Sequence, residues 1–464
     1  MIERMFGSMV AAERVDEMSA RSLLAAARAE QAVVRRAEAN LLEWALCWAV
    51  LHPSTDGTAG ADDAAVFFDA AGVEPLAGDG CPGVAEFAVA EFGTELGIST
   101  TAAKRLIGHA LELAHRLPRL WARVRAGEVD AWRARRVAEA TIHAHPRLTS
   151  EAAGWVDAQV APFAGRVGQA QVDRLVESAI ERFRLLDEGS EADDFVDQLH
   201  VTVSDGAAFA GTMDVHATLT VADGLDLENA LRAGAEELKA LGSEQHLGAR
   251  RARALGELAR RQTALDLASL ETAGEDEAPV ARRPVAARRL DLHLHFDVTA
   301  GGIAPTGALE NGQQLVLLEQ IKAWLGDSHT EIRVLPVLDL NTEIESAGYV
   351  PSPRLRRQVQ LRDGTCVFPW CSRPARSCDV DHVVPYTPRS SGEQAPAQTR
   401  TSNLGALCRS HHRLKTHTGW RVESPANGVF VWSSPHGHRY LRDRGGTTRL
   451  EPPDPSSPAL LPRT

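Results

Sequence analysis

Four cysteines and several histidines crowd into one short segment near the C-terminus of this chain. Cys366 and Cys371 flank a short turn, and Cys408 and His411 form a second pair further along the sequence. Two such pairs can supply three thiolates and one imidazole to a tetrahedral zinc ion. The ion would crosslink two distant segments and stabilise a module with little apolar mass. Cys378 is either an alternative fourth ligand in place of His411 or a packing residue.

A second set of polar residues is interleaved with these cysteines. Asp381 and His382 are consecutive in a short predicted strand, where neighbouring side chains point to opposite faces. Asn403 follows in a predicted loop. His411 and His412 are consecutive in a predicted helix, where neighbouring side chains diverge by ~100°. His411 can therefore face zinc while His412 faces a different ligand.

Taken together with Lys415, these residues resemble the HNH endonuclease superfamily, which has the ββα-metal fold. In that family the first histidine ends a β-hairpin strand, the asparagine lies in the following loop, and the last histidine is on the helix. The resemblance covers residues 350–420. Residues 10–330 are similar, more loosely, to the long N-terminal region of unknown function in many actinobacterial HNH proteins.

The resemblance implies a mechanism and a role for each residue. His382 would be the general base that takes a proton from the attacking water, because a pKa near ~6.5 leaves it largely neutral. Asp381 and His412 would hold one divalent cation, with Mg²⁺ or Mn²⁺ expected, which stabilises the leaving oxygen. Asn403 would complete the catalytic site by pinning the hairpin loop. His417 is either a further ligand of this ion or an exposed residue at the helix end.

The sequence departs from the family pattern in two places. The loop 387–402 is longer and richer in proline than a compact hairpin connection, which leaves the position of Asn403 open. His411 stands where the family commonly has a cysteine, although an imidazole is also a suitable zinc ligand.

Charge is divided unevenly along the chain. Residues 351–464 hold 17 Lys and Arg against 8 Asp and Glu, whereas the whole chain has a net charge of −12. A basic segment on an acidic body indicates a localised contact with a polyanion, here DNA. The residues expected to contact phosphate without reading the base sequence are Arg357, Arg362, Arg409, Arg413 and Lys415.

Hydrophobic periodicity predicts an α+β chain in which a mainly helical N-terminal region with a small mixed sheet precedes the zinc-stapled ββα-metal module. Apolar residues alternate as in strands at 199–203, 215–221 and 290–298, and helical patterns cover 10–51, 84–187 and 225–270. The expected regions are a helical region (1–187), a mixed α/β region (188–345) with an exposed linker near 271–289, the nuclease module (346–432) and a disordered tail (443–464).

Two weaker signals have simpler explanations. His293 and His295 share one face of a predicted strand, but no third ligand is nearby, so we interpret them as polar residues on its solvent side. Residues 92–110 resemble a helix-turn-helix, with Arg105 and His109 on the second helix. Such spacing is common in helical proteins, and a helical corner in the core is the favoured interpretation.

Nothing in the sequence is typical of a membrane or secreted protein, because no apolar stretch is long enough to span a bilayer and no signal pattern is present. We therefore expect a cytoplasmic protein with no membrane partner. The family resemblance implies that it is a metal-dependent DNA endonuclease that hydrolyses phosphodiester bonds and holds a structural zinc ion. A single HNH centre cuts one strand, so a double-strand break would need two copies, as in a homodimer. The alternative is a non-catalytic, zinc-scaffolded DNA-binding or regulatory protein.

Overall fold

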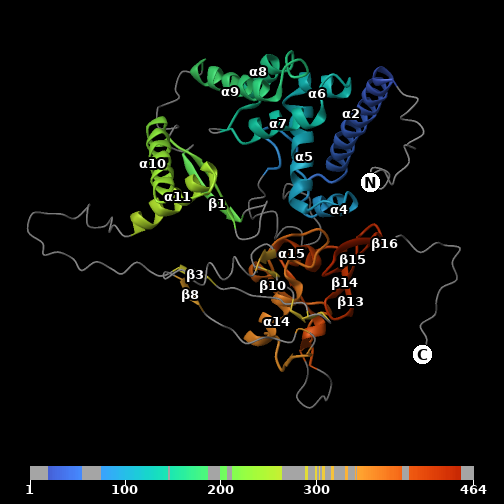
Figure 1. Cartoon of the computed structure of the whole chain (residues 1–464). Helices are drawn as coiled ribbons and strands as arrows, with labels where there is room; N and C mark the ends of the chain where they lie inside the picture. The colour runs from blue at the N-terminus through green and yellow to red at the C-terminus, as the bar shows by residue number, and fades with distance from the viewer. Residues whose placement is uncertain are drawn as a thin grey trace, which may run out of the picture. The chain divides into compact units, whose positions relative to one another are not determined.

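The computed structural model describes residues 19–54, 75–144, 147–186, 199–205, 212–263, 342–388 and 397–450, together with Leu340 and short strands between 288 and 332. The chain divides into two compact units (Figure 1). The first unit joins Met1–Asp194 to Leu340–Thr464, and the second is Phe195–Asp339. The predicted helical region and C-terminal module therefore belong to one unit, and the second unit is inserted between them in the sequence.

Proline and glycine divide the N-terminal part of the first unit into separate helices. Ser99 caps the helix that follows it, because its side-chain oxygen accepts a hydrogen bond of 3.2 Å from the amide of Ala102. Pro118 lies in the first turn of the next helix, where its missing N–H costs no hydrogen bond. The helices are α2 (Ala20–Leu51), α4 (Ala88–Glu95), α5 (Thr100–His115), α6 (Pro118–Arg125), α7 (Ala131–Ile142), α8 (Ser150–Val160) and α9 (Gln169–Leu186).

Helix α5 runs through the apolar core of these helices, where Ile107, Leu111 and Leu113 are fully buried. His109 is only 5% exposed, and its burial, followed by the charge of Arg135, lowers its pKa to about 4. A recognition helix must leave one face free to enter a DNA groove. The buried side chain of His109 is not free to read a groove, which agrees with the interpretation of this pattern as a helical corner.

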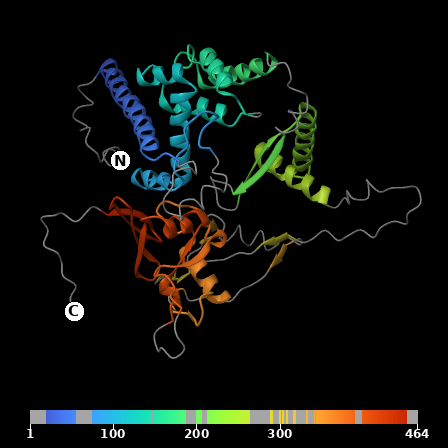
Figure 2. The same cartoon turned by 180° about the vertical axis from the view of Figure 1, so that it is seen from behind.

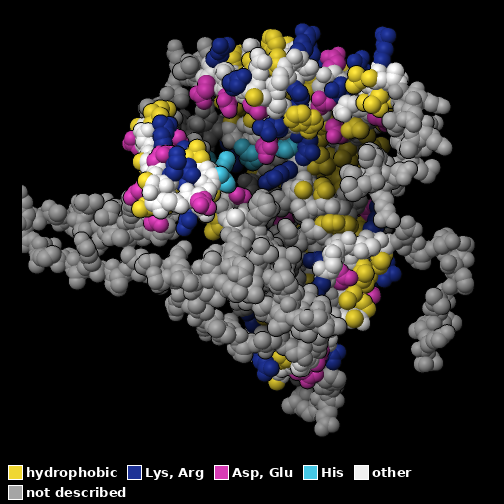
Figure 3. All heavy atoms as spheres, viewed as in Figure 1, with side chains coloured by type: hydrophobic (Ala, Val, Ile, Leu, Met, Phe, Trp, Pro, Cys, Tyr) yellow, Lys and Arg dark blue, Asp and Glu magenta, His cyan; other side chains and the backbone are white. Residues whose placement is uncertain are grey.

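Basic side chains of these helices border a cavity of about 410 Å³. Arg105 and His109 line it together with Lys104, His143 and Arg147. Figure 3 shows His side chains beside Lys or Arg side chains in a hollow on this side of the helices. None of the catalytic, metal or phosphate-contact residues predicted from the sequence lies among the described residues that line this cavity.

A two-stranded hairpin and the helix that follows it carry the predicted base and the predicted ligands of the divalent cation in the C-terminal part of the first unit. Strand β10 (Asp379–His382) pairs antiparallel with β12 (Leu404–Leu407), and α15 (Arg409–His417) follows β12 directly. Leu355 and Val359 of α14 (Pro353–Asp363) pack against Leu404 of β12. A second strand pair, β9 (Glu345–Ser346) with β11 (Thr399–Arg400), lies before and after this hairpin in the sequence.

A four-stranded antiparallel sheet completes this part of the chain (Figure 2). Its strands are β13 (Arg421–Ala426), β14 (Val429–Ser433), β15 (Arg439–Asp443) and β16 (Gly446–Leu450). Trp432 and Tyr440 are completely buried, so this sheet contributes to the core around the cysteines.

This sheet corrects the sequence prediction of a disordered tail over residues 443–464. Gly446–Leu450 form β16, which pairs with β15, and residues 451–464 lie outside the described residues. The predicted module also ended at Trp432, which is in the middle of β14. Gly- and Pro-rich composition indicated disorder, but the free edge of β15 supplies backbone hydrogen-bond partners to the residues that follow.

In the second unit, β1 (His200–Asp205) and β2 (Met213–Thr218) form an antiparallel pair. The single helix predicted over 225–270 is instead two helices, α10 (Val221–Ala240) and α11 (Leu247–Thr263). Gly242, with φ +91°, allows the chain to leave the first helix in a conformation that other residues rarely adopt.

The remaining described strands of this unit are short. They are β3 (Arg288–Leu290), β4 (Val298–Thr299), β5 (Gly302–Ile303), β6 (Thr306–Ala308), β7 (Leu315–Leu317) and β8 (Thr330–Ile332). His293 and His295 lie outside the described residues. Across the described parts of both units, no helix has the length and apolar character needed to cross a membrane.

Candidate metal centre and adjacent polar cluster

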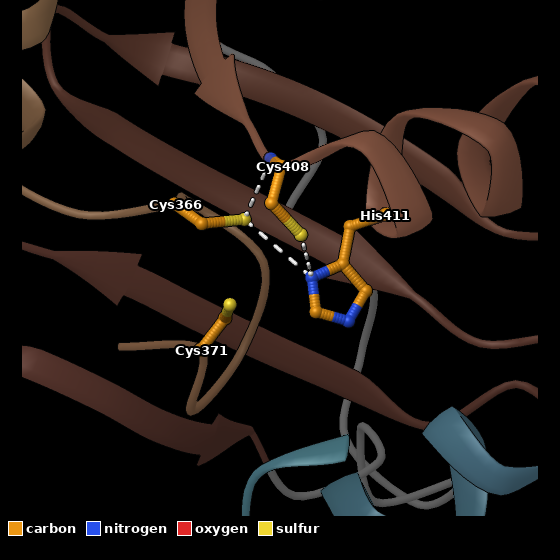
Figure 4. A group of neighbouring side chains, drawn as sticks. All are labelled: Cys366, Cys371, Cys408 and His411. Carbon is orange, nitrogen blue, oxygen red and sulfur yellow. Dashed lines mark hydrogen bonds between the residues drawn. The ribbon is translucent and has the colours of Figure 1, made fainter. Parts of the chain in front are cut away.

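Cys366, Cys371, Cys408 and His411, here called the cysteine cluster, converge on one point (Figure 4). One donor atom from each residue lies within 4.8 Å of the other three. Tetrahedral ligands placed 2.0–2.3 Å from a zinc ion lie roughly 3.5 Å from one another. The structure therefore confirms that these four residues form a group that can hold a metal ion such as zinc.

The imidazole of His411 is oriented toward the thiols. Its Nδ1 lies 3.2 Å from Sγ of Cys408 and 3.5 Å from Sγ of Cys366. The ring of Phe368 stacks on it at a centroid distance of 3.9 Å. Its other nitrogen, Nε2, lies 2.9 Å from Oγ1 of Thr100 in α5. Both ring nitrogens therefore have defined partners, and Nδ1 is the atom available to a metal.

The thiols of the cysteine cluster have opposed acidities. Burial raises the pKa of Cys366 well above its usual value. Hydrogen bonds from the Cys366 and Cys371 thiols lower the pKa of Cys408. Ionisation of one thiol thus opposes ionisation of the others, and a divalent cation would allow further thiols to ionise. The donor set fits a thiolate-binding metal.

Cys378, the alternative fourth ligand, is buried beside this site. Its Sγ lies 3.4 Å from the carbonyl oxygen of Pro374 and 3.9 Å from that of Arg373. Among the described residues, the group of donors that is compact enough for one metal ion contains His411 and does not contain Cys378.

On the neighbouring strand and helix, Asp379, Asp381, His412 and Lys415 form a second group, here called the carboxylate–histidine cluster. Residues two apart in β10 share one face, so Asp379 and Asp381 both point toward α15. Nδ1 of His412 lies 2.9 Å from Oδ2 of Asp379, and its Nε2 lies 3.4 Å from Oδ1 of Asp381. Nζ of Lys415 donates to Oδ2 of Asp381 at 2.6 Å.

These contacts set the protonation of the cluster. Burial opposes ionisation of Asp381, but the hydrogen bond from His412 and the charge of Lys415 outweigh it and lower its pKa to about 2. The hydrogen bond to Asp381, assisted by Asp379, raises the pKa of His412. The two carboxylates therefore stabilise positive charge on the side chains of His412 and Lys415. A metal cation at this place would have to compete with these two side chains for the carboxylates.

His382, the next residue after Asp381, has different partners. Its side chain is 4% exposed, and its Nε2 lies 2.9 Å from Oγ1 of Thr399. The ring of Tyr349 stacks on it at a centroid distance of 5.3 Å, and Tyr386 lies at 5.7 Å. Its main-chain carbonyl oxygen accepts a hydrogen bond from Lys415. Burial lowers the pKa of His382, so the imidazole is neutral at pH 7.

The hydroxyl of Thr399 indicates which nitrogen of His382 carries the proton. Thr399 Oγ1 donates to the carbonyl oxygen of Tyr349 at 3.4 Å. Its oxygen is therefore the acceptor for an N–H at Nε2 of His382. Nδ1 of His382 is left with its lone pair.

Asn403 links the two ends of the loop that follows β10. Its side-chain oxygen accepts from the amide of Val384 at 2.9 Å, and its Nδ2 donates to the carbonyl oxygens of Val384 (3.2 Å) and Gln398 (2.8 Å). Residues 389–396 between them lie outside the described residues. Asn403 makes these contacts with main-chain groups and lies at the end of the short helical turn Thr401–Asn403.

Arg362 was wrongly predicted to contact phosphate, because its side chain is buried. Arg362 is 4% exposed, pairs with Asp363 at 2.7 Å and donates to the carbonyl oxygens of Thr401 and Leu404, both at 2.6 Å. It joins α14 to the segment that leads into β12. A buried guanidinium with these partners is not available to DNA.

The other predicted contacts differ in exposure. The side chain of Arg409 is 79% exposed and lies 3.4 Å from Asp379, whereas Arg357 is half-buried. Arg413 pairs with Glu86 at 3.0 Å, and Lys415 belongs to the carboxylate–histidine cluster. His417, the last residue of α15, is exposed and is not part of the compact donor group found among the described residues.

Several residues of the site were missed in the sequence. Asp379 could have been found, because the Asp379–Asp381 spacing places two carboxylates on one strand face. No sequence signal pointed to Thr399, whose hydroxyl contacts His382 from another strand, or to Thr100, which is far from His411 in the sequence.

Comparisons with known proteins give similarity over a limited part of the chain. The chain is 41% identical over 124 residues to "Uncharacterized protein Rv3776" of Mycobacterium tuberculosis (strain ATCC 25618 / H37Rv), an alignment that covers 25% of this chain and 22% of that protein. It is 39% identical over 121 residues to "Uncharacterized protein MT2160" of Mycobacterium tuberculosis (strain CDC 1551 / Oshkosh), over 24% of this chain and 20% of that protein. No family model matches the chain, and no solved structure matches it.

Proposed function

We propose that this chain is a metal-dependent endonuclease that hydrolyses phosphodiester bonds in DNA. The observation that carries the proposal is the position of Asp381 of β10, 3.4 Å from His412 of α15, with the neutral imidazole of His382 as the next residue in the strand. A metal-binding pair and a general base are the minimum machinery for this reaction. His382 is the last residue of β10, where the alternation of side chains between the two faces of the strand ends.

The protein's own residues would act as follows. Nδ1 of His382, which has its lone pair free, takes the proton from the water that attacks phosphorus. Nδ1–H of His412 donates to Asp379, so Nε2 of His412 and Oδ1 of Asp381 are left as the two ligand atoms. A separation of 3.4 Å between them fits two ligands of one divalent cation. When bound, that cation would neutralise charge that develops on the phosphate and on the leaving oxygen.

The cysteine cluster would hold a structural zinc ion in this proposal. Its cysteines and histidine lie in the turn after α14 and at the start of α15, so the ion would link that turn to the helix that carries His412. Three reduced thiols fit a reducing compartment such as the cytoplasm. Zinc would hold the turn after α14 against the start of α15 without taking part in bond cleavage.

The charge distribution favours a polyanionic substrate, and the resemblance to HNH endonucleases makes DNA the proposed one. The net charge of residues 351–464 is +9, in a chain whose overall net charge is −12. Exposed guanidinium groups can bind phosphate without reading sequence. The exposed basic residues of this part of the chain include Arg354, Arg356, Arg373, Arg376 and Arg409.

The test is plasmid nicking by the purified full-length protein with added Mg²⁺ or Mn²⁺. We expect His382→Ala to reduce nicking by about 10²–10⁴-fold, the usual contribution of a general base, with zinc content unchanged. His216→Ala, an exposed histidine of β2, is the matched control and should nick like the wild type.

Two outcomes would contradict the enzyme proposal. Equal nicking by wild type and His382→Ala would mean that another base or a contaminant acts. DNA binding by the wild type without any nicking would favour the non-catalytic, zinc-scaffolded binding protein instead.

A further inference from the structure

The N-terminal helices contact the cysteine cluster directly. Oγ1 of Thr100, the first residue of α5, lies 2.9 Å from Nε2 of His411. His411 uses its other nitrogen, Nδ1, to face Cys408 and Cys366. The hydroxyl therefore sits on the outer side of the histidine ring, opposite the point where the donor atoms converge.

A metal-bound histidine normally donates its second ring N–H to an acceptor, which fixes the tautomer and the orientation of the ring. If Nδ1 of His411 binds a metal, Nε2 carries the proton and needs such an acceptor. Thr100 supplies it from a helix that begins 311 residues earlier in the sequence. Ser99 caps the helix, so the position of Thr100 is set by α5 itself.

The contact is part of a larger interface between α4 and the C-terminal strands. Ala90 of α4 is buried in the same apolar cluster as Cys366, and Phe87 packs against that cluster. Thr100 itself is half-buried, and together with His411 it lines a cavity of about 610 Å³. The docking of α4 on this apolar cluster therefore brings the start of α5 next to His411.

Acidic side chains on the same helical edge pair with basic ones of the strands and of α15. Glu86 pairs with Arg413 at 3.0 Å, Glu91 with His436 at 2.9 Å, and Glu95 with Arg449 at 2.5 Å. Tyr440 also donates to Glu95. Charge complementarity of this kind fixes the register of two docked surfaces more than it adds affinity.

We infer that Thr100 is a positioning residue of the metal centre, so that docking of the N-terminal helices and zinc binding by the cysteine cluster are thermodynamically coupled. This inference rests on metal binding by that cluster, which is one part of the proposed function, and does not need the chain to be a nuclease. Coupling between two events is reciprocal, so each must strengthen the other by the same factor.

The first experiment measures zinc affinity of full-length variants by competition with a chromophoric chelator. We expect Thr100→Val to bind zinc about 10–100-fold more weakly, the usual effect of removing a partner of a ligating histidine. Thr100→Ser keeps the hydroxyl and should restore wild-type affinity. Thr101→Val, at the exposed neighbouring position, is the matched control.

The second experiment measures the same coupling from the other side and does not depend on the folding of a Thr100 variant. Removing zinc from the wild type with the chelator should increase amide hydrogen exchange in Ala88–Glu95, since docking of α4 is weakened. Glu95→Gln, which loses a charged partner of Arg449 at the interface, should also weaken zinc binding, by less than Thr100→Val.

Equal zinc affinity of Thr100→Val and wild type would overturn the inference, as would unchanged exchange of α4 after zinc removal. A wild-type protein that binds no zinc would overturn both this inference and the structural role of the cysteine cluster. A wild-type protein that binds zinc but does not nick DNA would overturn the nuclease proposal and leave the coupling in place.

Discussion

The cysteine cluster and the carboxylate–histidine cluster each take one histidine from α15 and yet are built differently. The donor atoms of the cysteine cluster face one another, and three of its four residues are buried. In the carboxylate–histidine cluster, Asp379 and Asp381 face protein cations, and the side chain of His412 is 26% exposed. A closed donor set favours a permanent structural ion, whereas an open, partly satisfied set allows an ion and a substrate to enter together.

The largest expected effect is that of removing one ligand from the cysteine cluster, in which all four donor atoms face the metal position. Cys408→Ser removes one of the three thiols of the cysteine cluster but keeps a residue that can cap α15, and we expect loss of zinc and of folded structure over residues 353–450. Structural zinc contributes about 10–16 kcal/mol in small zinc modules, which exceeds the stability of most domains. Zinc content and circular dichroism of the purified variant are the measurements.

Two further cysteine variants sharpen this prediction. Cys47→Ser, at an exposed position of α2, should change neither measurement. Cys378→Ser should retain zinc, because Cys378 is not in the compact donor group. A Cys378→Ser protein without zinc, together with a zinc-loaded His411→Ala protein, would reverse the ligand assignment.

The second prediction compares two arginines that looked alike in the sequence. Arg362→Met should lower the free energy of unfolding by about 3–5 kcal/mol, because Asp363 and two carbonyl groups lose their buried partner. Arg409→Ala should leave stability unchanged and reduce the salt dependence of DNA binding by about one unit of slope. Urea denaturation and fluorescence-based DNA titrations at several salt concentrations measure these two effects. A stable Arg362→Met protein with weakened DNA binding would mean that the guanidinium is available to phosphate after all.

The third prediction concerns Asp379 in the open cluster. Asp379→Ala removes the acceptor for Nδ1–H of His412, and we expect binding of Mn²⁺ to weaken by about 10–100-fold. Zinc content should stay at the wild-type value, because the cysteine cluster is untouched. Electron paramagnetic resonance of free Mn²⁺ gives the affinity, and Glu423→Gln in β13 is the control carboxylate variant. Wild-type Mn²⁺ affinity in Asp379→Ala would show that His412 does not need this partner.

The smallest expected effect is a pH dependence in the carboxylate–histidine cluster. The pKa of His412 is raised above its ordinary value of 6.5 by its hydrogen bond to Asp381. Its stabilising contribution is therefore fully present below pH 6.5 and is lost as pH rises through the raised pKa. Without added Mg²⁺ or Mn²⁺, His412→Gln should cost more unfolding free energy at pH 5.5 than at pH 9, by about 1 kcal/mol. Chemical denaturation at both pH values measures it, and an equal or larger cost at pH 9 would contradict the protonated state of His412.

Local patterns in the sequence were sufficient for elements whose contacts are short-range. The cysteine spacings predicted the cysteine cluster, because each pair is closed by a turn that the chain makes by itself. The strand of Asp381 and the helix of His412 were predicted from local patterns, whereas the prediction that these two residues share a site came from the family resemblance. The same reasoning was wrong for Arg362 and for Gly446–Leu450, where the environment comes from residues distant in the sequence.

The sequence by itself therefore determined the donor atoms of this protein, since metal ligands, bases and basic side chains are chemical properties of individual residues. Only the tertiary structure decided which of these side chains are buried and which residues from distant parts of the sequence they contact. Arg362 is internal because α14 packs on β12, Thr100 lies against His411 because α4 and α5 dock on the C-terminal strands, and His382 lies under Tyr349. These outcomes depend on the free energy of packing distant segments together, which no local pattern of residues encodes.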